Sequence, residues 1–287
     1  MTGTSSGIGR ACALLLARQG FTVFAGVRKP ADGEALQKDG GERVIPIQID
    51  VTDHAAVTAA AKTVAVTLKS RGETLFALVN NAGIGLAAPL EFQPLADIKQ
   101  AFEINVVGQI AVTQAFLPLL RESRGRVVNI CSVGDRIAIP FGAALNGSKA
   151  AFALMSESLR LELRPFGMHV VIIDPGAITT PAVDKTLGDP DVLLARMAPD
   201  ASRLYGTFFR SFLARAGKRE RNGSPPTVVA DAVLAAVRDA HPRRRYIVGK
   251  GARTLATLPR VLPAPLLDRL RMKIFGMPTR FGDAARA

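Results

Sequence analysis

Residues 1–10 read MTGTSSGIGR, and the interpretation of the chain starts from this glycine-rich segment. Its glycines at positions 3, 7 and 9 would let the backbone turn tightly and approach a pyrophosphate seated on the N-terminus of a following helix. Apolar residues then recur at helical spacing from Ile8 to Leu16, Gly20 ends the pattern, and the strand FTVFAGV follows at 21–27. A glycine cluster alone is a weak signal, but this order of turn, helix and strand predicts a dinucleotide-binding α/β fold.

The rest of the chain continues to alternate strand and helix patterns. Apolar strands are predicted at 43–49, 75–79, 126–132, 168–174 and 244–249. Helices are predicted from about Ala31, from an Asp53 cap to about Ser70, and over 94–120, 148–165 and 227–240. This alternation predicts a Rossmann-type, doubly wound parallel sheet with helices on both faces. With no internal repeat or low-complexity linker, residues 1–287 are interpreted as one domain.

Composition limits the class of protein. Apolar residues make up 48% of the 287 residues, which supplies a sizeable core and excludes a disordered chain. Cys12 and Cys131 lie far apart and are predicted to be small buried hydrophobes in a reducing compartment, so we expect a cytoplasmic protein. The chain opens directly on the glycine turn, so no signal peptide is expected, and no apolar run reaches the length of a membrane span.

The net charge of +13 raises the question of a nucleic-acid partner. The basic residues are scattered, with a denser group only between Arg243 and Arg260, and no aromatic residues interleave with them as stacking platforms. We therefore expect no nucleic-acid binding. A solvated surface and attraction for an anionic cofactor account for the charge.

A second segment, residues 132–149, reads SVGDRIAIPFGAALNGSK and bears on whether the protein is catalytically active. Together with TGTSSGIG at 2–9, NNAG at 80–83 and PG at 175–176, it makes the chain resemble the short-chain dehydrogenase/reductase family. The resemblance covers about Thr2 to Gly249, with the motifs in the family's order. A weaker resemblance to the steroid and retinol dehydrogenase-like branch rests on VRKP at 27–30 and the extended C-terminus. The resemblance implies NAD(P)-dependent interconversion of secondary alcohols and carbonyls.

The resemblance also implies which side chains do the chemistry. In the family a serine steadies the carbonyl oxygen, a tyrosine gives or takes the proton, and a lysine holds the cofactor ribose and lowers the tyrosine pKa. Ser132 and Lys149 match the serine and the lysine. Asn105 in INVVG matches an asparagine that holds a relay water, although an asparagine in a helix is also a common hydrogen-bonding kink. The tyrosine position, 13 residues after Ser132 and four before Lys149, holds Leu145.

Leu145 has no exchangeable proton, so the direct loss of activity should be on the order of 10²–10⁴-fold. The chain's two tyrosines, Tyr205 and Tyr246, lie outside this segment, and no motif places either beside Lys149. Three interpretations remain open: an inactivated enzyme with an intact cofactor site, a pseudoenzyme that binds NADP(H) as a sensor or scaffold, and a slow enzyme in which water held by Lys149 and Ser132 donates the proton. We favour lost or strongly impaired activity.

The cofactor is predicted to be NADP(H) rather than NAD(H). After the second strand an acidic residue accepts the ribose hydroxyls of NAD, whereas a basic one, here Arg28, pairs with the extra phosphate of NADP. Arg10 could lend charge, and an ordinary solvated charge is the alternative for Arg28. By resemblance Asp50 holds the adenine amino group, and the nicotinamide carboxamide meets the 178–180 segment. The complete cofactor set that the resemblance implies is Gly3, Ser5, Ser6, Gly7, Ile8, Gly9, Arg28, Asp50, Val51, Asn81, Ala82, Gly83, Lys149, Pro175, Gly176, Ile178 and Thr180.

One element that the resemblance implies is missing from the pattern. A glycine turn of this kind normally follows a buried strand in the middle of the sheet, yet only Met1 and Thr2 precede Gly3. We interpret this as a start assigned too far downstream or a trimmed sequence. Without a central strand its neighbours would carry unpaired backbone groups, so the chain as written is predicted to fold poorly.

The regions after residue 180 bear on substrate and partners. Residues 181–226 are predicted to form a variable lid, and their leucines and aromatics favour an apolar pocket for a small lipophilic alcohol or ketone; packing of the lid against the body is the alternative. The extension at 252–287 alternates leucine with arginine, and its prolines exclude one continuous helix. We expect it to pack on the body, with peripheral membrane contact as the alternative. The helix at 148–165 favours a homo-oligomer, because family members often pair through it.

Overall fold

The structure is a computed structural model that describes residues 1–280. In chain order the strands are β1 (Val23–Val27), β2 (Val44–Gln48), β3 (Ala77–Asn80), β4 (Arg126–Ile130), β5 (His169–Pro175) and β6 (Arg245–Val248). The helices are α1 (Gly7–Arg18), α2 (Pro30–Gly40), α3 (His54–Arg71), α4 (Leu95–Phe102), α5 (Gly108–Glu122), α6 (Ala143–Leu163), α7 (Ala182–Leu187), α8 (Pro190–Ala195), α9 (Pro199–Arg221), α10 (Thr227–Arg238), α11 (Ala252–Val261) and α12 (Ala264–Phe275). Each strand predicted from the sequence is present within a few residues of its predicted bounds.

The strands form two parallel hydrogen-bonded groups, β2–β1 and β3–β4–β5–β6. Residues 1–4 run between them: the amide of Gly26 donates to the carbonyl of Met1 (2.7 Å), and the amide of Thr2 donates to the carbonyl of Val79 (3.0 Å). These residues occupy the place where the resemblance implies a first strand, although they form no regular strand. The predicted doubly wound parallel sheet is confirmed, and poor folding of the chain as written stays a prediction.

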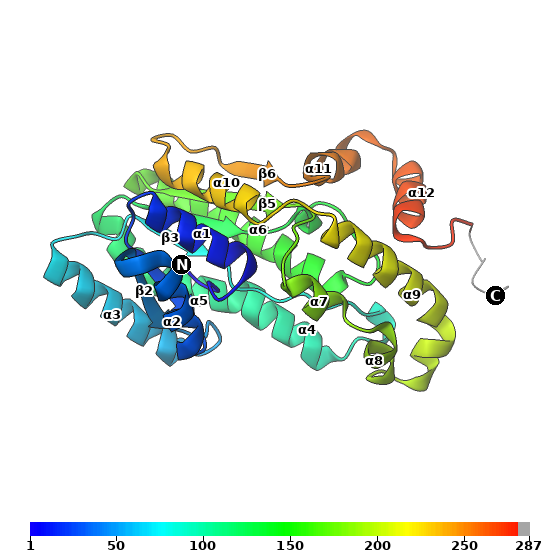
Figure 1. Ribbon diagram of the computed structural model, residues 1–287. Helices are drawn as coiled ribbons and strands as arrows, with labels where there is room; N and C mark the ends of the chain where they lie inside the picture. Colours follow the sequence, from blue (N-terminus) through cyan, green and yellow to red (C-terminus); the bar gives the residue numbers. More distant parts are fainter. Residues whose placement is uncertain (281–287) are drawn as a thin grey trace.

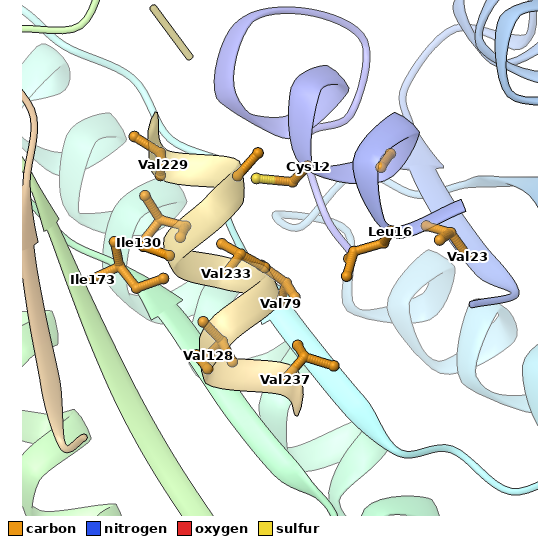
Figure 2. Packing of buried hydrophobic residues seen from close by; sticks show 14 of the residues in the cluster. Cys12, Leu16, Val23, Val79, Val128, Ile130, Ile173, Val229, Val233 and Val237 are labelled. Atoms are coloured by element: carbon orange, nitrogen blue, oxygen red, sulfur yellow. The ribbon is translucent and has the colours of Figure 1, made fainter. Parts of the chain in front are cut away.

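Helices α1, α2 and α10 cover one face of the sheet, with α1 and α10 packed against each other (Figure 1). Side chains alternate between the two faces of a strand, so every second residue of β3, β4 and β5 points to this layer. Figure 2 shows the resulting apolar cluster between the strands, α1 and α10. Its labelled members are Cys12, Leu16, Val23, Val79, Val128, Ile130, Ile173, Val229, Val233 and Val237.

Helices α3, α5 and α6 cover the opposite face. The intervening strand residues Leu78, Val127 and Val170 point there and pack among α3, α5 and the end of α6. Parallel strands buried on both faces read as continuous apolar runs, which is why VFAGV and RVVNI showed no polar alternation. Both cysteines are free and buried, as predicted.

Two helix starts bear on the site. The side chain of Asp53 accepts hydrogen bonds from the amides of Ala55 (2.9 Å) and Ala56 (3.0 Å), so the predicted cap of α3 is confirmed. Helix α6, predicted from residue 148, begins at Ala143 instead. This correction matters because it puts position 145 inside the same helix as Lys149.

The helix predicted over 94–120 is a continuous helical stretch from Leu95 to Glu122, in which a π-helical turn, η3 (Glu103–Val107), joins α4 to α5. By length and composition alone this stretch could cross a membrane, although no uninterrupted apolar run had indicated one. Its residues Val112, Phe116 and Leu120 pack in the core against α3 and the sheet, so it is a core helix of the fold.

The lid and the C-terminal extension are mainly helical. Segment 181–226 comprises α7, α8 and the long α9 (Figure 1). In the extension, α11 and α12 are separated at Leu262 and Pro263, which confirms that it is not one helix, although Pro259 lies inside α11. The extension packs on the body, since the ring centroids of Phe275 and Phe212 of α9 are 5.8 Å apart. Its last residues, 281–287, lie outside the described part of the chain.

Candidate active site

The carboxyl ends of the parallel strands meet along one edge of the sheet, where open α/β folds bind ligands. A cavity of about 1010 Å³ opens there, walled by the turn before α1, the strand ends, the start of α6 and parts of the lid and extension. Every predicted site residue except Asn105 lines this cavity. They are Gly3, Ser5, Ser6, Gly7, Ile8, Gly9, Arg28, Asp50, Val51, Asn81, Ala82, Gly83, Ser132, Leu145, Lys149, Pro175, Gly176, Ile178 and Thr180.

The turn before α1 leaves no room for side chains at its glycines. Gly3 and Gly7 have φ of +66° and +54°, in the left-handed region that favours glycine. A Cβ on Gly9 would lie only 2.0 Å from the carbonyl oxygen of Gly3. The first-turn amides of α1 have no partner within their own helix, so the turn presents backbone N–H groups at the cavity wall.

Asn81 ties the glycine turn to the end of β3. Its Nδ2 donates to the carbonyl of Gly3 (2.9 Å), while the amides of Asn81 and Ala82 each donate to Oγ1 of Thr2 (3.0 Å). From α5, Gln109 donates through Nε2 to the carbonyl of Ala82 (2.8 Å). A Cβ on Gly3 would meet the Cα of Ala82 at 2.8 Å, so the small residues of NNAG permit this close approach.

Two charged side chains follow β1 and β2 on the cavity wall. Arg28 is exposed to it. Asp50 accepts hydrogen bonds at Oδ1 from the backbone amide (3.0 Å) and the hydroxyl (2.8 Å) of Thr52. The hydrogen bond from the backbone amide is the main cause that lowers the pKa of the Asp50 carboxyl. The carboxylate stays ionised and fixed, as an acceptor of an amino group needs. Arg10, which we expected to lend charge to the cofactor, is instead paired with Asp39.

Lys149 is held at the base of the cavity and is only 8% exposed. Its Nζ donates to the carbonyl of Ile130 at the end of β4 (2.8 Å). Burial lowers the pKa of the ammonium. A Cβ at Gly83 would lie 3.5 Å from Nζ, so the glycine of NNAG leaves space beside the lysine.

Leu145 lies one helical turn before Lys149 on α6 and lines the cavity. Residues at this spacing share a helix face, so the leucine side chain takes the place that a proton donor beside Lys149 would need. It offers hydrocarbon alone. In residues 1–280 the one hydrogen bond of Lys149 Nζ goes to the backbone carbonyl of Ile130, and no side-chain hydroxyl is hydrogen-bonded to it.

Neither tyrosine replaces the missing group. The hydroxyl of Tyr205 donates to Glu91 (2.8 Å), and its ring packs edge-on against Phe141 with the ring centroids 6.2 Å apart. The hydroxyl of Tyr246 donates to Asp239 (3.3 Å). Neither ring is part of the cavity lining, so the expectation that no motif places them at the site agrees with the structure.

Ser132 begins the 3₁₀ turn η4 (Val133–Asp135), directly after β4 and Cys131. Its Oγ accepts a hydrogen bond from the amide of Gly134 (3.1 Å). A hydroxyl that accepts one bond still has its proton to donate. The serine therefore presents a hydrogen-bond donor to an oxygen held in the cavity.

Asn105 lies behind the cavity wall, in η3, and is fully buried. Its Oδ1 accepts from the amide of Ile84 (2.8 Å), and its Nδ2 donates to the carbonyl of Ile84 (3.0 Å) and to Oγ of Ser148 (3.0 Å). These bonds tie the loop after β3 to α6 and use both polar ends of the side chain. These bonds are long-range and differ from the local hydrogen-bonding kink that residue type alone favoured, and the relay role stays a prediction.

Sequence reasoning missed part of the wall. Of the apolar lid side chains expected in the pocket, Phe212 lines it, whereas Leu194 and Phe209 pack in the buried core of the lid. A buried ionic cluster beside Ser132 was also missed, although an aspartate ending an apolar strand was an available signal. The additional lining residues of the lid and extension are Ala182, Val183, Lys185, Thr186, Leu187, Ala216, Arg219, Glu220 and Phe275.

Comparison with known proteins fits this arrangement. Residues 1–190 match the sequence profile of the short chain dehydrogenases. The chain belongs to the short-chain dehydrogenase/reductase family. Retinol dehydrogenase 5 of Mus musculus is 37% identical to it, over 98% of this chain and 89% of its own length. Within the family the chain lies in the branch of the retinol and 17-beta-hydroxysteroid dehydrogenases.

Solved structures of this family share the fold. A short chain dehydrogenase from Burkholderia cenocepacia in complex with NADP has a TM-score of 0.68 and 28% identity, covering 94% of each chain. A family member from Burkholderia phymatum in complex with NAD has a TM-score of 0.75 and 24% identity, over 98% of this chain and 95% of its own. The parallel sheet and its helical layers are thus those of the family.

Proposed function

We propose that the protein binds NADP(H) in this cavity as an oxidoreductase of lipophilic secondary alcohols and carbonyls, with turnover strongly reduced by Leu145. The observation that carries the proposal is the place of Leu145. It stands on the cavity wall one turn before Lys149, and Ser132 and the glycine turn line the same cavity.

The residues of the cavity fit a dinucleotide. A side chain at Gly9 would collide with the Gly3 backbone, and Gly7 has a positive φ and a tight 3.2 Å approach to Thr180, so glycines at these positions let a ligand approach the backbone amides. Arg28 favours the phosphate of NADP(H), and the complex from Burkholderia cenocepacia supports this choice, while the family also contains NAD complexes. When bound, the nicotinamide supplies or accepts the hydride.

The chain's own groups then divide the remaining work. Ser132 would donate its hydroxyl proton in a hydrogen bond to the substrate oxygen and hold that oxygen at the base of the cavity. Lys149, already fixed by Ile130, would orient the ribose hydroxyls. No group at position 145 transfers a proton, so the proton comes from a water that Lys149 and Ser132 hold. That route lacks the roughly 10²–10⁴-fold contribution of a positioned acid.

The substrate is proposed to be lipophilic because the outer cavity is apolar. Ile139, Phe141, Leu187, Phe212 and Phe275 contribute to its wall from the loop before α6, the lid and the extension. An apolar wall with a few placed donors orients a hydrophobic alcohol or ketone. The name of the relative retinol dehydrogenase 5 describes a substrate of this class for that protein.

Single-turnover transfer of a label tests the proposal. The protein is incubated with NADPH carrying deuterium at C4 of the nicotinamide and with retinaldehyde or a ketosteroid, and the alcohol product is analysed by mass spectrometry. Slow appearance of deuterium on the carbinol carbon is expected. Brisk steady-state turnover by the unaltered protein would contradict the role given to Leu145.

A non-catalytic NADP(H)-binding protein is the second candidate. The hydrocarbon at position 145 favours it, since an intact nucleotide cavity without a proton donor suits a sensor or scaffold. NADPH binding without any label transfer over long incubation would support this candidate over the first.

Assembly as a homo-oligomer through α6 is also proposed. Leu154 (71%) and Leu161 (59%) are exposed and lie seven residues apart, so they share the outer face of this helix. Covering this face with a second copy would remove both from water. The prediction of oligomeric pairing rests on this exposed face.

A cytoplasmic location with peripheral contact to an anionic membrane surface is a further part of the proposal. At the junction of α11 and α12, Val261 (64%) and Leu266 (51%) are exposed, with the exposed basic residues Arg260 and Arg269 beside them in the sequence. Apolar side chains flanked by arginine suit the headgroup region. Sedimentation with phosphatidylserine vesicles, and its loss in a Val261→Asp variant, would support contact; no sedimentation would exclude it.

A further inference from the structure

An ionic cluster is buried directly beneath the turn that carries Ser132. Arg245, the first residue of β6, places Nη1 2.5 Å from Oδ2 of Asp135 and 2.7 Å from Oδ2 of Asp174. The side chains of Asp135 and Asp174 are 2% and 0% exposed, and that of Arg245 is 12% exposed. One guanidinium thus joins two carboxylates that water does not reach.

The two carboxylates belong to different parts of the site. Asp174 lies in β5, next to the end of the strand that leads into the 175–176 segment of the cavity. Asp135 ends the turn η4, and its amide donates to the carbonyl of Ser132 (3.0 Å). A bond from Arg245 to both therefore fixes the turn of Ser132 to the neighbouring strand.

The opposite side of the turn packs against apolar side chains of the C-terminal extension. Val133 and Ile137 pack against Ala252 and Leu255 of α11 and Leu267 of α12. Such contacts have no direction, so they do not define where the Ser132 hydroxyl points. Directional bonds come from the amide of Gly134, which donates to Oγ of Ser132 (3.1 Å), and from Arg245, which holds Asp135 on the polar side.

Other charges near the cluster are farther away. Nε of Arg136 lies 3.7 Å from Asp135 and 3.5 Å from Asp174, and Oε1 of Glu157 lies 3.5 Å from Nη2 of Arg245. Removing Arg245 would leave two buried carboxylates near each other, with Arg136 and the ammonium of Lys149 as their remaining counter-charges. Their repulsion would push Asp135, and with it the turn, away from β5.

We propose that Arg245 is a positioning residue for Ser132, acting through Asp135 and Asp174. It sets the direction of the serine hydroxyl toward the cavity without touching substrate or cofactor. The inference rests on the proposed function in one respect, namely that Ser132 holds the substrate oxygen.

The test compares Arg245→Met with Arg244→Met. Arg244 is the adjacent, exposed arginine and takes part in no ion pair within residues 1–280, so it is a matched control. Amide hydrogen exchange of segment 132–136, the unfolding free energy and NADPH binding by fluorescence are measured on the full chain. For Arg245→Met we expect the Gly134 and Asp135 amides to exchange roughly 10- to 100-fold faster, beyond any change in the other strands, with NADPH affinity nearly unchanged.

Exchange that stays at the control level, or rises evenly throughout the sheet, would overturn the proposal. Should Arg245→Met fail to fold, Asp135→Asn provides the second variant, because it weakens the bond to the turn and leaves the Arg245 to Asp174 pair in place. The same local loosening is expected for it, and unchanged exchange in this variant would equally overturn the proposal.

An activity arm separates this inference from the proposed function. In a Leu145→Tyr background, Arg245→Met should lower kcat roughly tenfold with little change in the KM for NADPH, and Arg245→Lys should restore part of it. A fall in NADPH affinity without a fall in kcat would contradict a positioning role. If the tyrosine background itself shows no turnover, the proposed function fails, while the exchange measurement still decides the role of Arg245.

Discussion

Replacing Leu145 with tyrosine would place a phenol one helical turn before Lys149, on the cavity wall. The surroundings already suit it: the cavity of about 1010 Å³ offers space for the larger ring. The buried ammonium of Lys149 shares the helix face of position 145, where its positive charge would favour the phenolate. Ser132 lines the same cavity, and the proposal assigns it to hold the substrate oxygen.

The expected gain follows from what the substitution adds. A positioned general acid contributes on the order of 10²–10⁴-fold, which corresponds to about 3–5 kcal/mol off the activation barrier. Since Ser132, Lys149 and the glycine turn are retained, we expect Leu145→Tyr to raise kcat with NADPH and a lipophilic carbonyl by this amount. NADPH affinity should change little, because no cofactor-binding residue is altered.

Two matched variants isolate the hydroxyl. Leu145→Phe adds the same ring without the oxygen, so it controls for changes in packing and should stay at the activity of the unaltered protein. Adding Lys149→Met to Leu145→Tyr should return turnover toward that level, since the phenol then loses the ammonium beside it. Initial rates of NADPH oxidation, with product identified by mass spectrometry, give the comparison.

Equal activity of the tyrosine and phenylalanine variants would refute the reasoning. Such a result would mean that proton donation is not what position 145 lacks, or that the site is disrupted elsewhere. High activity in the unaltered protein would also refute the reasoning, because it would mean that catalysis does not need a proton donor at position 145.

Three further predictions test the cofactor, the buried cluster and the assembly. Arg28→Glu should weaken NADPH binding roughly 10- to 100-fold and spare NADH binding in fluorescence titrations, because the cavity wall would lose the guanidinium proposed to pair with the extra phosphate. Burial, then the neighbouring Asp135, raises the pKa of Asp174 from 3.8 to about 6, so the fold disfavours this carboxylate and stability is lost as pH rises from about 4 to about 6. Asp174→Asn should reduce this dependence of the unfolding free energy on pH, which is worth at most about 3 kcal/mol, as measured by urea unfolding at pH 4 and pH 7. If the variant loses as much stability between the two pH values as the unaltered protein, the prediction is wrong. Leu154→Glu should shift the mass in light scattering toward the monomer with NADPH binding retained, and an unchanged mass would exclude α6 as the interface.

Local sequence rules predicted most of the fold. The continuous apolar runs of the strands, the Asp53 cap and the glycine turn each follow from backbone and burial requirements that act within a few residues. The start of α6 was misplaced because Gly142 and the small residues at 143–144 carry no capping signal. Tertiary packing against η4 and η3 sets that boundary instead.

The sequence predicted those parts of the site that belong to a single local motif. Glycine spacing, NNAG and the Ser132 to Lys149 interval brought one wall together, since NNAG lies at the end of β3, Ser132 follows β4, and the glycine turn meets them at the same edge. The cluster of Asp135, Asp174 and Arg245 joins three segments distant in sequence, and nothing local marks them as partners. The contacts of Asn105 likewise depend on how α6 crosses η3, which the sequence pattern does not encode.

Titrating the unaltered protein with NADPH, and then adding a lipophilic carbonyl to the saturated complex, tests the central claim most directly. The account predicts saturable binding by nicotinamide fluorescence, weakened in a Lys149→Met variant, followed by slow or no oxidation of the bound NADPH. Absence of binding, or rapid oxidation on adding the carbonyl, would contradict a retained nucleotide cavity whose proton donor has been replaced by Leu145.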